Sequence, residues 1–158
     1  MPSELKAIGF WPEPGLHGLV HPKRLIDPSL DPRVREGLAA YLQSGRLCNG
    51  YLGYSSCRLS CGIPDTEMGD CEMTDGTWLW PVGLVHYVSD HDLQLPTDFI
   101  VDAESNGWSS PITGDGILGE HYNYDLSYWR DWCRANASNW WRTGLSLPTL
   151  NVNKTDEP

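Results

Sequence analysis

Apolar residues recur at helical spacing in two stretches of the chain. The first follows Asp31-Pro32, where the Asp side chain can cap free backbone amides and Pro fits the first turn of a helix. Its apolar residues recur three and four positions apart as far as Gly45, which predicts a helix over residues 32–44. The second stretch has similar spacing and predicts a helix over residues 125–135.

The centre of the chain mixes strand and helix signals. Residues 47–58 contain β-forming tyrosines interrupted by glycines, which indicates an extended segment. Residues 72–80 predict a β-hairpin with its turn at Asp75-Gly76. A proline then precedes residues 82–90 and can open a helix there. The apolar residues between 93 and 101 predict a further short strand or helix.

The remaining segments have the composition of arms and loops. Residues 1–30 are rich in Pro and Gly, which predicts an extended arm packed on the domain and not a helix. Residues 103–119 predict a long loop, and residues 150–158 a flexible tail. Residues 31–149 should then form a single small α+β domain, with a zinc-finger-like core at 51–101. A chain of 158 residues can bury its own core without a metal.

The charge and the aromatic content limit the classes of partner that this chain could bind. The formal net charge is −10, and residues 59–129 contain thirteen Asp or Glu and no Lys or Arg. This acidic stretch repels phosphate, which argues against nucleic acid, and suits a partner protein with a basic surface or a cation. It is equally typical of a surface that resists aggregation. Eight Trp and seven Tyr against two Phe suit shallow cores and interfaces.

The chain shows no sign of export. Its start lacks the apolar run of a signal peptide, and no stretch approaches the length of a membrane span. We therefore expect a cytoplasmic, reducing compartment and no membrane partner. Five cysteines are an odd number, so metal ligation explains closely spaced Cys and His better than disulfides do.

Two cysteines and two histidines have the spacing of zinc ligands. Cys57 and Cys61 are separated by three residues, and His86 and His91 by four. Zinc in structural sites prefers thiolate sulfur and imidazole nitrogen in such pairs. On an ideal helix the two histidines would lie roughly 140° apart, so the last turn must be distorted for them to meet. These four residues are the predicted Zn²⁺ site, on a turn and a helix joined by the hairpin. The alternative is that no metal binds and that they are reduced cysteines and ordinary core histidines.

Other residues compete for roles in this site. Cys71 could replace Cys57 or one histidine, whereas Cys48 suits a small buried side chain. A site with three ligands and a water would instead support hydrolysis. Its general base would be one of three nearby acids, Glu67, Glu72 or Asp75. Glu120 and His121 could also supply acid–base chemistry, but they are more typical of a polar loop before the next helix.

One region resembles an uncharacterised bacterial protein family. The run GYSSCRLSCG and then MTDGTWLWPVGLVHYVSDHDLQLPTDFI are similar to its Cys-Arg-x-Cys-Gly turn and its Thr-Asp-Gly-x-Trp-x-Trp-Pro-x-Gly-Leu-x-His-Tyr-Val segment. The similarity covers residues 51–101 and implies a metal-like layout but no particular reaction. This chain has three residues between its cysteines where the family pattern has two, so the turn should bulge by one residue.

The sequence is compatible with three classes of function. The favoured one is a non-enzymatic zinc-binding protein, because four protein ligands close the coordination shell. Its structural zinc would support a surface, acidic and rich in Trp, for a protein partner. The alternatives are a metal-dependent hydrolase and a finger-like nucleic-acid-binding protein. The second alternative is disfavoured because the predicted helix over residues 82–90 has no Lys or Arg to meet phosphate.

Overall fold

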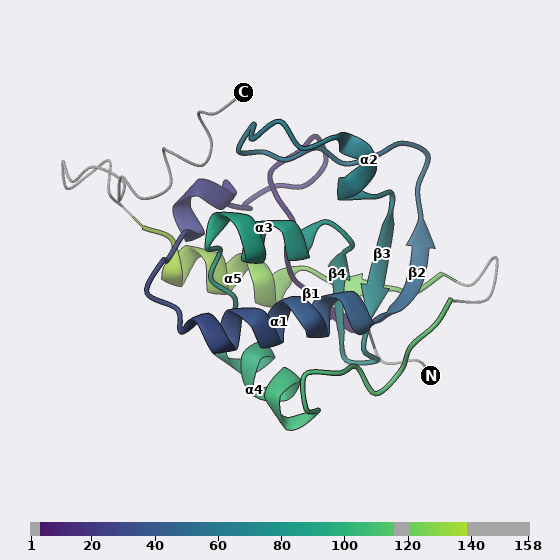
Figure 1. The fold of residues 1–158 in the computed structure, drawn as a ribbon. Coiled ribbons are helices and arrows are strands. Elements are labelled where there is room, and N and C mark those ends of the chain that lie inside the picture. The colour runs from purple at the N-terminus through teal and green to yellow at the C-terminus, as the bar shows by residue number, and fades with distance from the viewer. Residues whose placement is uncertain (1–3, 116–120, 139–158) are drawn as a thin grey trace.

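A five-stranded mixed sheet forms the centre of the fold (Figure 1). The structure, a computed structural model, describes residues 4–115 and 121–138. In their order across the sheet the strands are β2 (Arg46–Gly50), β3 (Cys71–Thr74), β4 (Trp78–Pro81), β1 (Leu5–Ala7) and β5 (Tyr124–Asp125). Strands β2, β3 and β4 are antiparallel, whereas β1 runs parallel to both β4 and β5.

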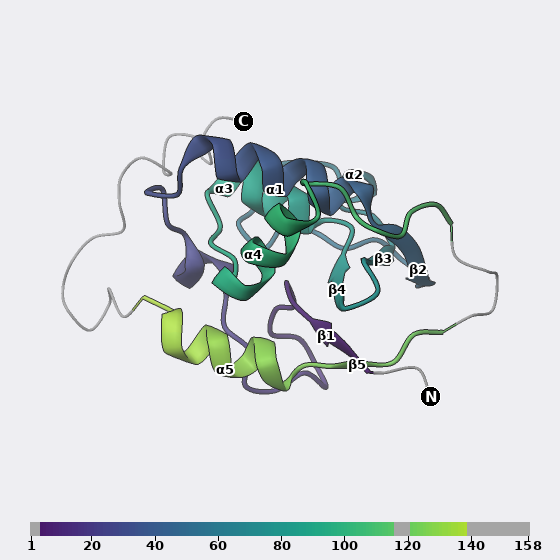
Figure 2. The same cartoon turned by 90° about the horizontal axis from the view of Figure 1, so that it is seen from below.

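Helices cover both faces of this sheet. They are η1 (Pro22–Leu25, a 3₁₀ helix), α1 (Pro32–Ser44), α2 (Asp65–Met68), α3 (Leu84–His91), α4 (Thr97–Ser105) and α5 (Ser127–Asn136). Figure 2 shows α1 and α3 on one side of the sheet and α5 on the other, next to β1. The predicted α+β class, with a hairpin, a helix after it and flanking helices, is confirmed.

Both helices that the apolar spacing predicts are present. Helix α1 has the predicted bounds, and the Asp31 carboxylate accepts a hydrogen bond from the amide of Arg33 at 2.9 Å. Helix α5 begins at Ser127, two residues later than predicted. Asp125 ends β5 instead, and its carboxylate accepts a hydrogen bond from the amide of Ser127 at 3.1 Å, so it precedes the helix.

The hairpin forms as predicted, but the proline after it does not open a helix. At the turn, Asp75 accepts hydrogen bonds from the amides of Thr77 and Trp78, at 2.8 and 2.7 Å. Pro81 is the last residue of β4, opposite Glu72. Proline has no amide proton to donate to a neighbouring strand. It can end this strand because the hydrogen bond to β3 is made by the next amide, that of Val82, which donates to the carbonyl of Cys71. Helix α3 starts only at Leu84.

The apolar segment between residues 93 and 101 contains most of a helix. Helix α4 follows Pro96 and buries Phe99 and Ala103, four residues apart on one face. It continues to Ser105, so the loop predicted from residue 103 begins three residues later. The loop between residues 62 and 70 contains one unpredicted helical turn, α2, which buries Met68.

The N-terminal segment is more ordered than the predicted arm. Its residues 5–7 form β1, in which Leu5 and Ala7 are buried and Lys6 is exposed. This strand pairs with chain more than 70 residues away, so its neighbours cannot be inferred locally. Residues 22–25 form a 3₁₀ helix where no helix was expected, and the ring of His21 accepts a hydrogen bond from the amide of Lys23.

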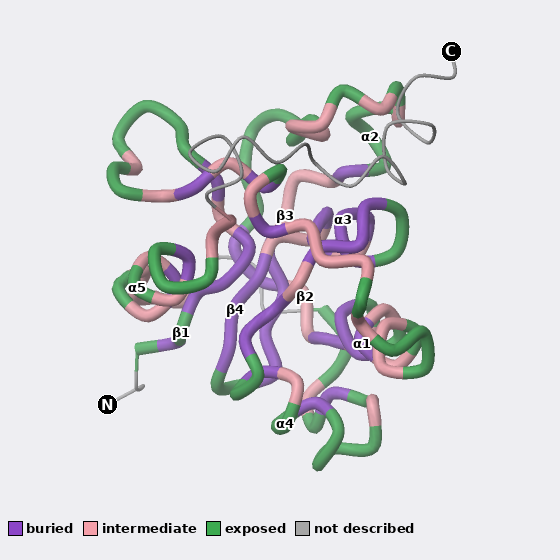
Figure 3. The backbone as a smooth tube through the Cα atoms, turned by 90° about the vertical axis from the view of Figure 1, so that its left-hand side faces the viewer, coloured by how far each residue is buried: buried purple, intermediate pink, exposed green. Residues whose placement is uncertain are grey.

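Aromatic side chains fill the core between the sheet and α1, α3 and α4. Phe99 packs edge-on against Tyr41, Trp78 and Trp80, with ring centroids 5.5 to 5.7 Å apart. Of the tryptophans in the described part of the chain, four are buried: Trp11, Trp78, Trp80 and Trp129. These four side chains are part of the hydrophobic core. They therefore cannot supply the partner interface that the tryptophan content suggested. Figure 3 shows that burial is concentrated along the strands.

Some expectations fall on residues that the structure does not describe. The tail at 150–158 and the acid Glu120 lie outside the described residues. Within residues 4–115 and 121–138, none of the helices combines the length and apolar character needed to cross a membrane.

Candidate metal centre

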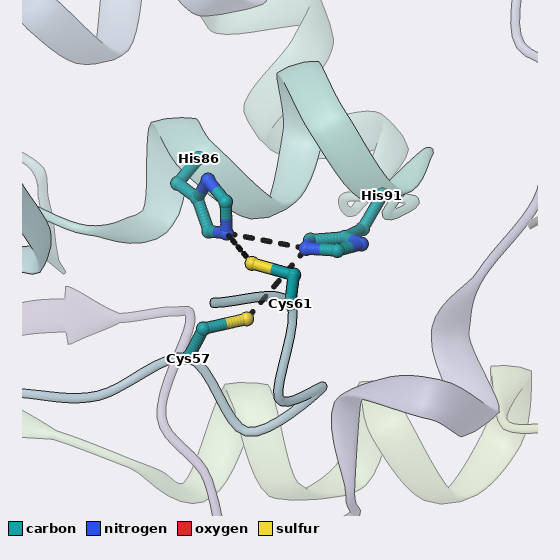
Figure 4. Close-up of side chains that lie close together, drawn as sticks. All are labelled: Cys57, Cys61, His86 and His91. Carbon is teal, nitrogen blue, oxygen red and sulfur yellow. Dashed lines mark hydrogen bonds between the residues drawn. The ribbon is translucent and has the colours of Figure 1, made fainter. Parts of the chain in front are cut away.

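The four predicted ligands meet at one point between a loop and a helix (Figure 4). Cys57 and Cys61 come from the turn after β2, and His86 and His91 from α3. One ligand atom from each residue lies within 4.8 Å of all the others. Both histidines are buried, and both cysteines are partly exposed. The structure thus brings together residues that are up to 34 positions apart.

Three residues separate the two cysteines, and the chain turns tightly between them. The amide of Ser60 donates to the carbonyl of Cys57 at 3.2 Å, which closes a tight turn. Ser60 itself lies in the left-handed region, with φ of 53°, and Gly62 follows with φ of 86°. The sulfurs of Cys57 and Cys61 lie within 4.8 Å of each other across this turn.

The environment of Cys57 favours the neutral thiol when no cation is present. Burial raises the pKa of the Cys57 thiol, while hydrogen bonds from the backbone of Leu59 and Cys61 act in the opposite direction. Backbone donors around a cysteine sulfur stabilise its negative charge. A nearby cation would complete that stabilisation, which is the situation of a metal-bound thiolate.

A widened last turn of α3 allows two histidines five residues apart to converge. The amides of Asp92 and Leu93 both donate to the carbonyl of Tyr87, five and six residues back. A wider turn advances less than the roughly 100° per residue of a regular α-helix, so the angle between His86 and His91 narrows. Asp92 ends the helix in the left-handed conformation, with φ of 53°.

Asp90 fixes the orientation of one histidine and was missed by the sequence analysis. Its carboxylate lies 2.9 Å from Nδ1 of His86, one helical turn away. A proton on Nδ1 shared with this carboxylate leaves Nε2 with the lone pair that a metal needs. The spacing of four residues on a helix was the available signal.

Tyr87 fastens the cysteine turn to α3 and was also missed. Its hydroxyl accepts a hydrogen bond from the amide of Arg58 at 2.8 Å and reaches the carbonyl of Ser56 at 3.5 Å. Burial raises the pKa of Tyr87 to about 12, so the hydroxyl keeps its proton at neutral pH. The ring also packs edge-on against Trp11, which connects the site to the N-terminal segment.

Three of the six separations among the ligand atoms are close to those of a tetrahedral ion. Zinc bonds of about 2.3 Å to sulfur and about 2.05 Å to nitrogen require about 3.6 Å between sulfur and nitrogen and about 3.3 Å between nitrogens. The Sγ–Nε2 distances are 3.6 Å for Cys57–His91 and 3.3 Å for Cys61–His86. The two Nε2 atoms are 3.1 Å apart. All three values lie within about 0.3 Å of the reference, so this group can hold one metal ion.

The competing candidates lie elsewhere. Cys71 donates to the carboxylate of its neighbour Asp70, and Cys48 is a buried residue of β2. The three possible bases are also placed differently: Glu67 is exposed on α2, Glu72 bonds to Asn49 and Tyr51, and Asp75 caps the hairpin turn. His121 is exposed in the loop before β5. Among the described residues, only the two cysteines and two histidines form such a group of possible metal ligands.

Comparisons of the chain with protein-family models, with curated proteins and with solved structures found no match. The resemblance to a bacterial family over residues 51–101 therefore remains a prediction.

Proposed function

We propose that Cys57, Cys61, His86 and His91 bind one Zn²⁺ ion in a closed structural site, and that this protein is not an enzyme. The observation that carries the proposal is the convergence of four ligand atoms within 4.8 Å, with three of their six separations close to those of a tetrahedron. Two thiolates and two imidazoles favour zinc over the hard cations that prefer oxygen. Four protein ligands leave no position for a reacting water, so the ion stabilises the fold and does no chemistry.

The zinc site would hold a surface for a protein partner. It fastens the segment between β2 and α2 to α3, and this segment carries three exposed apolar residues: Tyr51, Leu52 and Tyr54. Leu52 is fully exposed, at 107% of its reference area. Acidic side chains of α2 follow in the same segment. A partner with an apolar contact surrounded by basic side chains would complement it.

Metal content and thermal unfolding test the zinc site. We expect one zinc per chain in the purified protein. At free zinc a thousandfold above the dissociation constant, binding stabilises the native state by about 4 kcal/mol. For a chain of this size, removing zinc with a chelator should therefore lower Tm by about 8–16 °C.

Two alanine variants separate ligation from the general loss of a cysteine. Cys61→Ala should remove both the zinc and the chelator effect. Cys71→Ala is the matched control, because its sulfur bonds only to Asp70 among the contacts described and should leave both intact. Zinc-free protein with an unchanged Tm, or equal effects of the two substitutions, would contradict the proposal.

A photo-crosslinking amino acid placed at position 52 tests the partner surface. We expect a discrete crosslinked protein in cells, which disappears when Cys61→Ala is added. The control position is Val101, an exposed apolar residue on α4 at the opposite end of the molecule from α2 (Figure 1). Equal crosslinking from both positions, or none from position 52, would refute this surface.

A further inference from the structure

A cavity of about 270 Å³ lies beside the metal centre and does not belong to it. The N-terminal segment, the start of β3, the start of α3 and β5 all contribute to its walls. Five aromatic side chains line it: Phe10, Trp11, Tyr51, Tyr87 and Tyr124. Ser56, Arg58 and Tyr87 line the cavity and also position the cysteine turn. The cavity has the size and the largely apolar lining of a site for a small ligand or a single side chain.

A buried carboxylate is part of this lining. Glu72 is only 3% exposed, and it accepts hydrogen bonds at both oxygens. Nδ2 of Asn49 donates to Oε2 at 2.9 Å, and the hydroxyl of Tyr51 donates to Oε1 at 2.8 Å. Both donors are neutral. Among the described residues no Lys, Arg or His forms an ion pair with this carboxylate, although positive charge on His121 acts on it at longer range and opposes the rise of its pKa. Burial raises the pKa of Glu72, which shows that its charged form lacks full compensation.

The backbone is distorted where it supports this carboxylate. The register of β2 against β3 shifts between Cys48 and Gly50, and Asn49 is the extra residue, with φ of 27°. Its amide group also exchanges two hydrogen bonds with the backbone of Tyr122, at 2.9 Å each. Bulges of this kind re-aim a side chain and are frequent beside binding sites. The distortion holds Glu72 in a defined orientation without supplying a positive charge.

The charge around the cavity is negative. Glu13, Asp70 and Glu72 line it against a single cation, Arg58. The guanidinium of Arg58 is already engaged, by the carbonyl of Pro12 at 3.0 Å and by Glu13 at 3.4 Å. An anionic ligand would meet repulsion, whereas a cation would relieve the uncompensated charge of Glu72. Aromatic walls also favour a cation, because ring faces attract positive charge.

From these observations we infer that the cavity binds an ammonium group carried on an apolar stem, with Glu72 as its counter-ion. The stem lies among the aromatic side chains, and the ammonium donates to the carboxylate. A free organic amine and the side chain of a lysine both have this chemistry. The inference does not depend on a protein partner or on the identity of the metal.

A titration of the ¹⁵N-labelled, metal-loaded protein with matched probes tests the inference. The probes are 2-phenylethylamine, its neutral counterpart 2-phenylethanol, and lysine blocked at both ends. We expect the amine to bind at least tenfold more tightly than the alcohol. Its shift changes should include the indole NH of Trp11, which lines the cavity, and not that of Trp80, which is bonded to the carbonyl of Leu42. Binding of the blocked lysine alone would support the same chemistry, with a lysine side chain as its source.

Two charge-removing variants complete the test. Glu72→Gln should abolish the preference for the amine over the alcohol. Glu67→Gln removes the same charge from the exposed face of α2, outside the cavity lining, and should leave the preference unchanged. If Glu72→Gln does not fold, the comparison of amine with alcohol on the wild-type protein still decides. Equal binding of the two, or no binding of any of the three probes, would overturn the inference.

Discussion

Replacing Asp90 should weaken metal binding without destabilising the metal-free protein. The Asp90 carboxylate lies 2.9 Å from Nδ1 of His86 and is 60% exposed, so it contributes little to packing. In the native protein it holds the imidazole with Nε2 toward the other ligands. Asp90→Ala removes this acceptor. Asp90→Asn keeps an oxygen that can accept the hydrogen bond but removes the charge.

The magnitude follows from the exposure of the carboxylate. Loss of such an outer partner costs 10–100-fold in metal affinity, and solvent screening of Asp90 places this case near the lower limit, about tenfold for Asp90→Ala. Tenfold corresponds to about 1.4 kcal/mol. Under saturating zinc this should lower Tm by about 3–6 °C. Asp90→Asn should fall between the wild type and Asp90→Ala.

Competition with a chromophoric chelator measures the zinc affinity, and thermal unfolding with and without metal measures stability. The metal-free proteins should unfold at the same temperature, because the effect of Asp90 acts through the bound ion. Asp65→Ala, another exposed acid at the start of α2, is the control for a general charge effect. Unchanged affinity in Asp90→Ala, or an equal loss in Asp65→Ala, would refute the assignment of Asp90 to the metal centre.

The remaining predictions concern stability. Tyr87→Phe leaves the amide of Arg58 without its acceptor and should lower the free energy of unfolding by about 1–2 kcal/mol in urea; an unchanged midpoint would show that the hydroxyl does not fasten the turn. Phe99→Ala empties the centre of the aromatic core and should cost about 3–5 kcal/mol in the same assay, whereas a loss below about 1 kcal/mol would contradict the packing. Because burial raises the pKa of Glu72, its carboxyl keeps its proton to higher pH in the native state than in the unfolded one, where the value is 4.5. Stability should therefore fall as pH rises above that value, and Glu72→Gln should remove this part of the fall; parallel curves would contradict it.

Features with local signals were predictable from the sequence. The bounds of α1 followed from Asp31, Pro32 and Gly45, because capping and helix termination depend on neighbouring residues. The hairpin turn at Asp75-Gly76 was predictable for the same reason. The four residues of the candidate metal site could be predicted because cysteine and histidine pairs are rare and closely spaced.

Features set by distant parts of the chain were not predictable. Strand β1 has only three residues, and its parallel pairing with β4 becomes visible only in the folded sheet. The sequence analysis expected Pro81 to open a helix, whereas it ends β4. A proline fits both the first turn of a helix and the end of a strand, so the residue alone does not distinguish them. The roles of Tyr87 and Asn49 depend on segments brought together by the fold, and no local pattern marks them.

The central claim is that two sulfurs and two nitrogens surround one zinc ion. X-ray absorption at the zinc edge of the purified protein tests this most directly, since it counts the bound atoms and measures their distances. We expect two sulfur atoms at about 2.3 Å and two nitrogen atoms at about 2.0–2.1 Å. Cys57→Ala and His91→Ala should each change that count or abolish binding. A shell made mainly of oxygen, or the same spectrum in both variants, would contradict the account.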